Sequence, residues 1–157
     1  AVERRRRRRL QALELLPLEA VLRNLLSISC LSETVAVALL ACNREHTTLA
    51  PVHRIITEIL RDEVQHARLG WKVLEDVEID ARTRRRLGDY LVLAFRQLFD
   101  RHYLRPEARP RRGVPALGVD DAREASELFL DTVHAVIVPG RERHGLPAEA
   151  AVRAALA

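Results

Sequence analysis

Two glutamates and a histidine stand where the helical pattern calls for apolar residues, and together they could bind a metal ion. Glu33 interrupts an apolar stretch, and thirty residues later comes the segment Glu63-Val-Gln-His66. Side chains three residues apart project from one face of a helix, so Glu63 and His66 would lie side by side. Iron, manganese and zinc all accept carboxylate and imidazole ligands. We therefore expect these three residues to be metal ligands, and we expect no catalytic residue beyond them.

Helical phase, at about 100° per residue, places the three side chains on the stripes that should form the core. Glu33 lies near the middle of one apolar stripe, and Glu63 and His66 lie in the centre of the next. The first stripe consists of Leu22, Leu26, Ser29, Glu33, Ala36, Val37 and Leu40. The second consists of Val52, Ile55, Ile56, Ile59, Leu60, Glu63, His66, Ala67, Gly70, Val73 and Leu74.

Burial of these acids needs a compensating positive charge. An unpaired buried carboxylate costs several kcal/mol, and no lysine or arginine occupies the two stripes nearby. A bound cation would neutralise both carboxylates and accept the imidazole nitrogen. The alternative is a metal-free helix pair in which Glu33 and His66 contact each other. The remaining histidines are expected at the surface, namely His46, His53, His102, His134 and His144.

The elements that must position these ligands are helices, and we expect an all-α, antiparallel bundle with four main helices. Leucine, alanine and arginine dominate, aromatic residues make up only 4% of the 157 residues, and no strand-like alternation is present. Residues 1–16 are expected to be a disordered basic lead-in, and residues 17–157 a single bundle domain. The expected helices run from Pro17 to about Glu45, from Pro51 to about Leu74, from Thr83 to Tyr103, and from Asp120 or Asp121 to Pro139-Gly140. A fifth, short helix could follow Pro147, and residues 105–119 should form a loop.

The ligand pattern resembles that of the ferritin-like di-iron carboxylate proteins. The resemblance rests on Glu33 followed by Asp62-Glu63-Val64-Gln65-His66, and the string DEVQHARLGW is similar to bacterial ferritin-like domain proteins. It covers residues 18–75, while 83–139 would be accessory helices. It implies two metal ions, expected to be iron with manganese or zinc as alternatives. Glu33 would be a terminal or bridging ligand, Glu63 the bridging carboxylate and His66 the nitrogen ligand, with Asp62 orienting a facing imidazole.

The resemblance implies two glutamates and two Glu-x-x-His units, but the chain shows one of each. Asp100 and Asp131-Thr-Val-His134 are spaced much like Glu33 and Glu63-Val-Gln-His66. Helical phase argues against a metal site there, because both aspartates would point away from the apolar faces of their helices. Those faces are Leu87, Leu91, Ala94, Phe95 and Leu98 on one helix, and Ala122, Ala125, Phe129, Val133 and Val136 on the other. The site would be completed either by a homodimer or by a missing N-terminal half.

The resemblance implies a di-iron oxidoreductase or an iron-handling protein. Arylamine N-oxygenases of this type need a further histidine, and Ile59, one turn before Glu63, argues against that activity. The competing hypothesis is a non-catalytic helical module whose Arg4–Arg9 tail binds nucleic acid or an acidic partner, although the tail lacks aromatic residues. No apolar run long enough to span a membrane is evident, and Cys30 and Cys42 are too far apart on one helix for a disulfide. We expect a cytoplasmic protein.

Overall fold

The computed structural model describes residues 17–102 and 112–157, and within these ranges regular structure is almost entirely helical. The all-α prediction is confirmed, and the helices form five continuous rods, the fifth of which is the short helix expected after Pro147, while the predicted bundle of four main helices is not confirmed. The rods are α2 (Pro17–Ser27) with η1 (Ile28–Glu33) and α3 (Thr34–His46), α4 (Ala50–Asp76), α5 (Ala81–His102), α6 (Ala122–Thr132) with η4 (Val133–Ile137) and α7 (Val138–Arg143), and α8 (Ala148–Leu156). A short 3-10 helix, η3 (Pro115–Leu117), lies before α6. The predicted lead-in 1–16, Tyr103 and much of the predicted loop lie outside the described residues.

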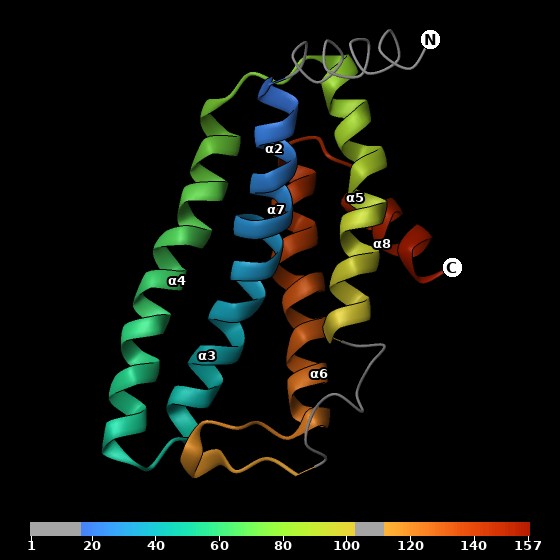
Figure 1. The fold of residues 1–157 in the computed structure, drawn as a ribbon. Helices are drawn as coiled ribbons and strands as arrows, with labels where there is room; N and C mark the ends of the chain where they lie inside the picture. The colour runs from blue at the N-terminus through green and yellow to red at the C-terminus, as the bar shows by residue number, and fades with distance from the viewer. Residues whose placement is uncertain (1–16, 103–111) are drawn as a thin grey trace, which may run out of the picture.

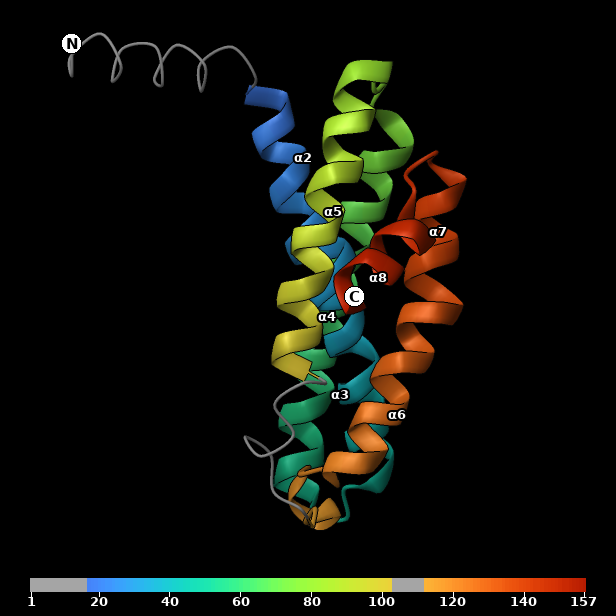
Figure 2. The same ribbon diagram turned by 90° about the vertical axis from the view of Figure 1, so that its right-hand side faces the viewer.

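Successive long rods run in opposite directions, as expected for an antiparallel bundle (Figure 1). The α2–η1–α3 rod and α4 lie side by side, joined by residues 47–49 (Figure 1). α5 returns beside α2, and the α6–η4–α7 rod completes the bundle (Figures 1 and 2). α8 packs against α5 and α7 on the outside. α4 lies at one edge of the bundle, and its main neighbours are α3 and η1.

The core lies between α2, η1, α5, α8 and the α6–η4–α7 rod, and leucine, valine, phenylalanine and alanine supply most of it. The predicted apolar face of α5 is confirmed, since Leu87, Leu91, Ala94, Phe95 and Leu98 are all buried. Phe99 packs edge-on against Phe129 with ring centroids 5.4 Å apart, which joins α5 to α6. Glu19 is buried beside this core, and its carboxylate forms salt bridges with Arg23 and Arg86.

Two π-helical segments interrupt the α-helices and change which residues are buried. Such a segment has more than 3.6 residues per turn, so a prediction at 100° per residue loses phase across it. Cys30 and Leu31 in η1 are buried, although neither belonged to the predicted stripe. In η4 the prediction of Val136 as a core residue was wrong, because Val136 is 50% exposed while Ile137 is fully buried.

The predicted end of the fourth helix at Pro139-Gly140 was also wrong, since the helix continues to Arg143. Pro139 lies two residues after the wide turns of η4, and such turns relieve the clash between a proline ring and the preceding carbonyls. Gly140 provides room for a neighbour, because a Cβ there would lie 2.8 Å from the Trp71 ring. The helix instead ends before Gly145, whose φ of 69° suits glycine.

The first rod also differs from expectation in its apolar character. The stretch Leu18–His46 has the length and composition to cross a membrane, with a mean hydropathy of 2.0 in its most apolar window. The expectation that no segment reaches this threshold was therefore wrong. A third of that window is buried inside the bundle, and the core helices of soluble proteins pass the same test. The property is weak support for a membrane span.

Candidate metal centre

The structure brings Glu33, Glu63 and His66 together where the first rod packs against α4. Glu33 is the last residue of η1, and Glu63 and His66 lie one turn apart on α4. One ligand atom from each residue lies within 4.8 Å of the others. The Nδ1 atom of His66 is 3.9 Å from a carboxylate oxygen of Glu33 and 3.9 Å from one of Glu63.

The close approach of η1 to α4 depends on Gly70, one turn after His66. A Cβ at position 70 would lie 2.4 Å from the Cβ of Ser29 and 2.9 Å from the Sγ of Cys30, so only glycine fits without a shift. Trp71 also stabilises the contact between η1 and α4, because its indole nitrogen donates to the hydroxyl of Thr34 at 3.2 Å. The glycine and tryptophan of the α4 sequence therefore hold Glu33 against the ligands on α4.

Hydroxyl groups stabilise the wide turns that end at Glu33. The Ser32 hydroxyl donates to the Ser27 carbonyl at 3.1 Å, and the Thr34 hydroxyl donates to the Ser29 carbonyl at 3.4 Å. π-helical turns are rare and often occur at functional sites, where they reposition a side chain. Here the extra residue in the turn sets the direction in which Glu33 leaves the helix.

The distances among the three side chains suit an interposed ion better than a direct hydrogen bond. Hydrogen bonds between nitrogen and oxygen are about 2.7–3.2 Å long, so His66 at 3.9 Å bonds directly to neither glutamate. The second carboxylate oxygen of Glu33, Oε2, is buried and has no hydrogen-bond partner. A buried acceptor without a partner is costly, and a cation between the carboxylates would satisfy it. The metal-free alternative, a pairing of Glu33 with His66, is present as an ion-pair contact of 3.9 Å without a hydrogen bond.

The predicted burial of the site was wrong in part. The side chain of Glu33 is 19% exposed and that of Glu63 is 26% exposed, but that of His66 is 57% exposed. Only one side of the predicted α4 stripe is covered, with Ile56 and Leu60 buried while Ile55 and Ile59 are 56% and 44% exposed. The cause is the position of α4 at the edge of the bundle. The ligands therefore line an open face.

Most of the other residues considered in the sequence analysis lie at the surface. Asp62, the residue expected to orient a facing imidazole, is exposed beside Glu63. Asp131 and His134 are exposed, as predicted. Asp100 is half-buried, so the prediction that it faces solvent was only partly right. The Arg4–Arg9 tail lies outside the described residues.

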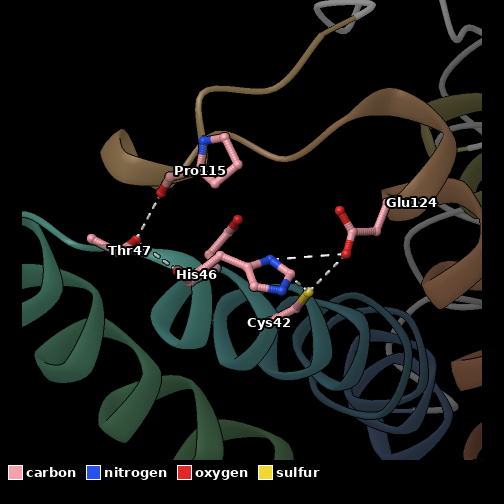
Figure 3. Close-up of polar contacts among 6 residues, drawn as sticks. Cys42, His46, Thr47, Pro115 and Glu124 are labelled. Atoms are coloured by element: carbon pink, nitrogen blue, oxygen red, sulfur yellow. Dashed lines mark hydrogen bonds and ion pairs between the residues drawn. The ribbon is translucent and has the colours of Figure 1, made fainter.

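A second group of metal-ligand residues was missed by the sequence reasoning. Cys42, His46 and Glu124 place one ligand atom each within 4.8 Å of one another (Figure 3). His46 had been expected to be an isolated surface histidine, and it is exposed but has these two neighbours. Cys42 and His46 are four residues apart on α3, which was a readable signal. Glu124 comes from α6, and nothing in the sequence relates the two helices.

Burial and neighbouring charges shift the acid–base properties of both cysteines. Burial raises the pKa of the Cys30 thiol to about 11, and nearby Arg141 opposes the shift. Burial also raises the pKa of Cys42, with further contributions from the carboxylates of Asp120, Glu124 and Glu45. Both thiols are free, as predicted. A raised pKa disfavours the thiolate, so neither cysteine has the properties of an activated nucleophile.

Arg141 is a fully buried cation next to η1. Its guanidinium donates to the carbonyl of Leu26 at 2.6 Å and lies 5.7 Å from the centroid of the Trp71 ring. Burial lowers the pKa of Arg141 to about 10. Arg141 therefore connects α7 to the start of the wide turns that carry Glu33.

Comparison of the chain with models of protein families, with curated proteins and with solved structures found no match.

Proposed function

We propose that Glu33, Glu63 and His66 bind a metal ion, and that the chain contributes half of a ferritin-like two-metal carboxylate centre. The observation that carries this proposal is the meeting of three ligand atoms within 4.8 Å, with a carboxylate oxygen of Glu33 buried and unpartnered. Two carboxylates at this separation repel each other, and a divalent cation removes the repulsion. The resemblance of the ligand spacing to ferritin-like proteins agrees with this geometry.

The exposed side of α4 supports the second half of the proposal. Ile55, Ile59 and Leu69 are 56%, 44% and 57% exposed, and they lie on the same side of the helix as His66. Exposed apolar residues grouped around a metal ligand are typical of a surface that another protein element covers. A second helix pair of the same kind would cover these residues and would bring a second set of ligands. The pair would come from a second copy of the chain or from a preceding segment of a longer protein.

The ligand set indicates the chemistry of the bound metal. Mixed oxygen and nitrogen ligands accept iron, manganese or zinc, and a pair of iron ions supports oxidation by dioxygen or peroxide and the handling of iron itself. Glu33 and Glu63 would supply the negative charge that holds the ions, and His66 a neutral nitrogen. The proposed class is therefore a di-iron oxidoreductase or an iron-handling protein.

Metal binding to matched variants tests the proposal. The full chain carries Cys42→Ser, which removes the sulfur ligand of the second cluster, and Mn²⁺ is the probe because it needs no control of oxidation. We expect Glu63→Ala and His66→Ala each to weaken Mn²⁺ binding at least tenfold. His53→Ala is the control, since His53 is an exposed histidine on the same helix. Equal binding by all variants would overturn the proposal.

The source of the second helix pair is tested by subunit mass. If a second copy completes the site, the chain is a dimer in solution, and Ile59→Asp separates the subunits and weakens metal binding. Glu58→Asp, on the exposed side of α4 in the adjacent position, is the control and leaves the dimer intact. A chain that stays monomeric at all concentrations and metal loadings excludes the second copy.

A further inference from the structure

Cys42, His46 and Glu124 join the end of α3 to the start of α6. Cys42 and His46 lie on successive turns of α3, with His46 as its last residue. Glu124 lies in the first turn of α6. Figure 3 shows the imidazole of His46 and the sulfur of Cys42 directed towards the carboxylate of Glu124. Three different ligand types thus meet from two helices that are distant in the sequence.

The three ligand atoms form a nearly equilateral triangle. The Sγ atom of Cys42 lies 3.7 Å from the Nδ1 atom of His46, and an oxygen of Glu124 lies 3.9 Å from that sulfur and 3.8 Å from that nitrogen. A point equidistant from three such atoms lies about 2.2 Å from each, which is close to the zinc–ligand distances of about 2.0–2.3 Å. A zinc ion at that point lies in the plane of the three atoms, and small side-chain rotations that bring the atoms closer together would let it move out of the plane towards a fourth ligand.

Both helix ends that carry the ligands are held in place by their own contacts. Asp121 caps α6, because its carboxylate accepts a hydrogen bond from the backbone nitrogen of Arg123 at 2.9 Å. The Thr47 hydroxyl lies 2.6 Å from the Asn43 carbonyl and 3.3 Å from the Pro115 carbonyl, which ties the end of α3 to η3 (Figure 3). The ligands thus project from fixed backbone.

The local charge also favours a cation. Glu124 contributes one negative charge directly, and Asp120 and Glu45 are close enough to act electrostatically on Cys42. The side chain of Glu124 is 48% exposed and that of His46 is 42% exposed, so an ion has a path from solvent. Sulfur, imidazole and carboxylate together are a ligand set that zinc accepts readily.

We propose that Cys42, His46 and Glu124 form a zinc site with an open fourth position for water, separate from the group Glu33, Glu63 and His66 (the Glu33 centre). Binding replaces the S–H bond of Cys42 by an S–Zn bond, and the proton passes to solvent, so each bound ion releases one proton from the thiol. The ion connects α3 to α6 across the end of the bundle where residues 112–119 pack. The site therefore couples the stability of that end of the molecule to zinc.

Cobalt is the diagnostic probe, because Co²⁺ bound to a thiolate gives a near-ultraviolet charge-transfer band that oxygen and nitrogen ligands do not give. The full chain with His66→Ala binds Co²⁺ with this band, and Zn²⁺ displaces it at one equivalent. Cys42→Ser abolishes the band, and Glu124→Gln and His46→Gln weaken Co²⁺ binding at least tenfold. The controls are Glu127→Gln, one turn further along α6, and Cys30→Ala, which keep the band.

Alkylation provides a second readout that does not depend on cobalt. Zn²⁺ slows the reaction of Cys42 with a maleimide at least tenfold in the folded chain, while the buried Cys30 stays unreactive with or without the ion. A folded chain in which Co²⁺ gives no charge-transfer band, or in which Zn²⁺ leaves the alkylation of Cys42 unchanged, overturns the proposal. Those outcomes would make the trio an ordinary cluster of surface contacts and would leave the Glu33 centre unaffected.

Discussion

Substitution of Gly70 by alanine should separate the two helices that carry the Glu33 centre. The new Cβ would lie 2.4 Å from the Cβ of Ser29, about 1.0 Å short of an ordinary contact. Because the Ser29 Cβ is attached directly to the backbone, it cannot rotate away. η1 must therefore move by about 1 Å, and Glu33, one turn later, moves with it.

The displacement is large compared with what one ion can bridge. Two ligand atoms on a common ion with bonds of about 2.1 Å can be at most about 4.2 Å apart. The present separation between His66 and Glu33 is 3.9 Å, so an outward movement of 1 Å places the atoms beyond that limit. We expect Gly70→Ala to weaken Mn²⁺ binding at least tenfold.

The effect on stability should be smaller, because two contributions oppose each other. Overpacking costs about 1–3 kcal/mol, and replacement of a helical glycine by alanine returns about 1 kcal/mol. The expected net loss is about 1 kcal/mol, or a decrease in Tm of about 2–4 °C for a chain of this size. Calorimetry and Mn²⁺ titration on the same samples separate the two effects.

Gly88→Ala is the matched control, because Gly88 is a buried helical glycine away from the centre. A Cβ at position 88 would lie 3.0 Å from the ring of Pro147, a milder contact. We expect this variant to keep full Mn²⁺ affinity. If Gly70→Ala binds Mn²⁺ as tightly as the parent chain, or if both variants lose affinity equally, the argument that helix separation controls the site is refuted.

Three further predictions concern stability. Glu19→Gln should cost about 1–3 kcal/mol in urea unfolding because it breaks a buried pairing with two arginines, whereas Glu149→Gln, in an exposed pair, should change little. The pKa of Cys30 rises from 9.0 to about 11 on folding, so the stability due to its neutral thiol is complete below pH 9 and is lost as the pH rises through 11. Cys30→Ala should therefore lose less stability than the parent chain between these pH values, by up to about 2–3 kcal/mol, and parallel pH profiles would contradict this. Asp80 caps the start of α5, and hydrogen bonds from Thr83 lower its pKa below 3.8. The stabilisation that the ionised Asp80 carboxylate provides is therefore present above pH 3.8 and is lost at lower pH. The decrease in Tm caused by Asp80→Asn should accordingly shrink between pH 6 and pH 3.

Periodicity predicted the all-helical fold, and it placed Glu33, Glu63 and His66 on neighbouring helical stripes, where the structure brings the three side chains together. Their role as metal ligands stays a prediction. In α5, which is regular throughout, every predicted core residue from Leu87 to Leu98 is buried. In the first and fourth rods the same argument failed within the π-helical turns, where for example Ile137 replaces Val136 in the core. No periodicity reveals such turns, since they arise from packing between rods.

Two other features required knowledge of which helices are neighbours. The exposure of Ile55 and Ile59 follows from the edge position of α4, which its own sequence does not express. The contact of His46 with Glu124 joins α3 to α6, and the intervening helices separate these residues by 78 positions. The α3 part of this cluster, Cys42 and His46, was readable as an i, i+4 pair, but its carboxylate was not.

Trp71 gives the molecule an intrinsic optical reporter. It is the single tryptophan of the chain, and its indole nitrogen bonds to Thr34, the residue after Glu33. Its fluorescence should therefore respond when η1 and α4 change their spacing, and a paramagnetic ion bound nearby should quench it. The emission of one unlabelled side chain can thus follow the occupancy of the Glu33 centre in real time.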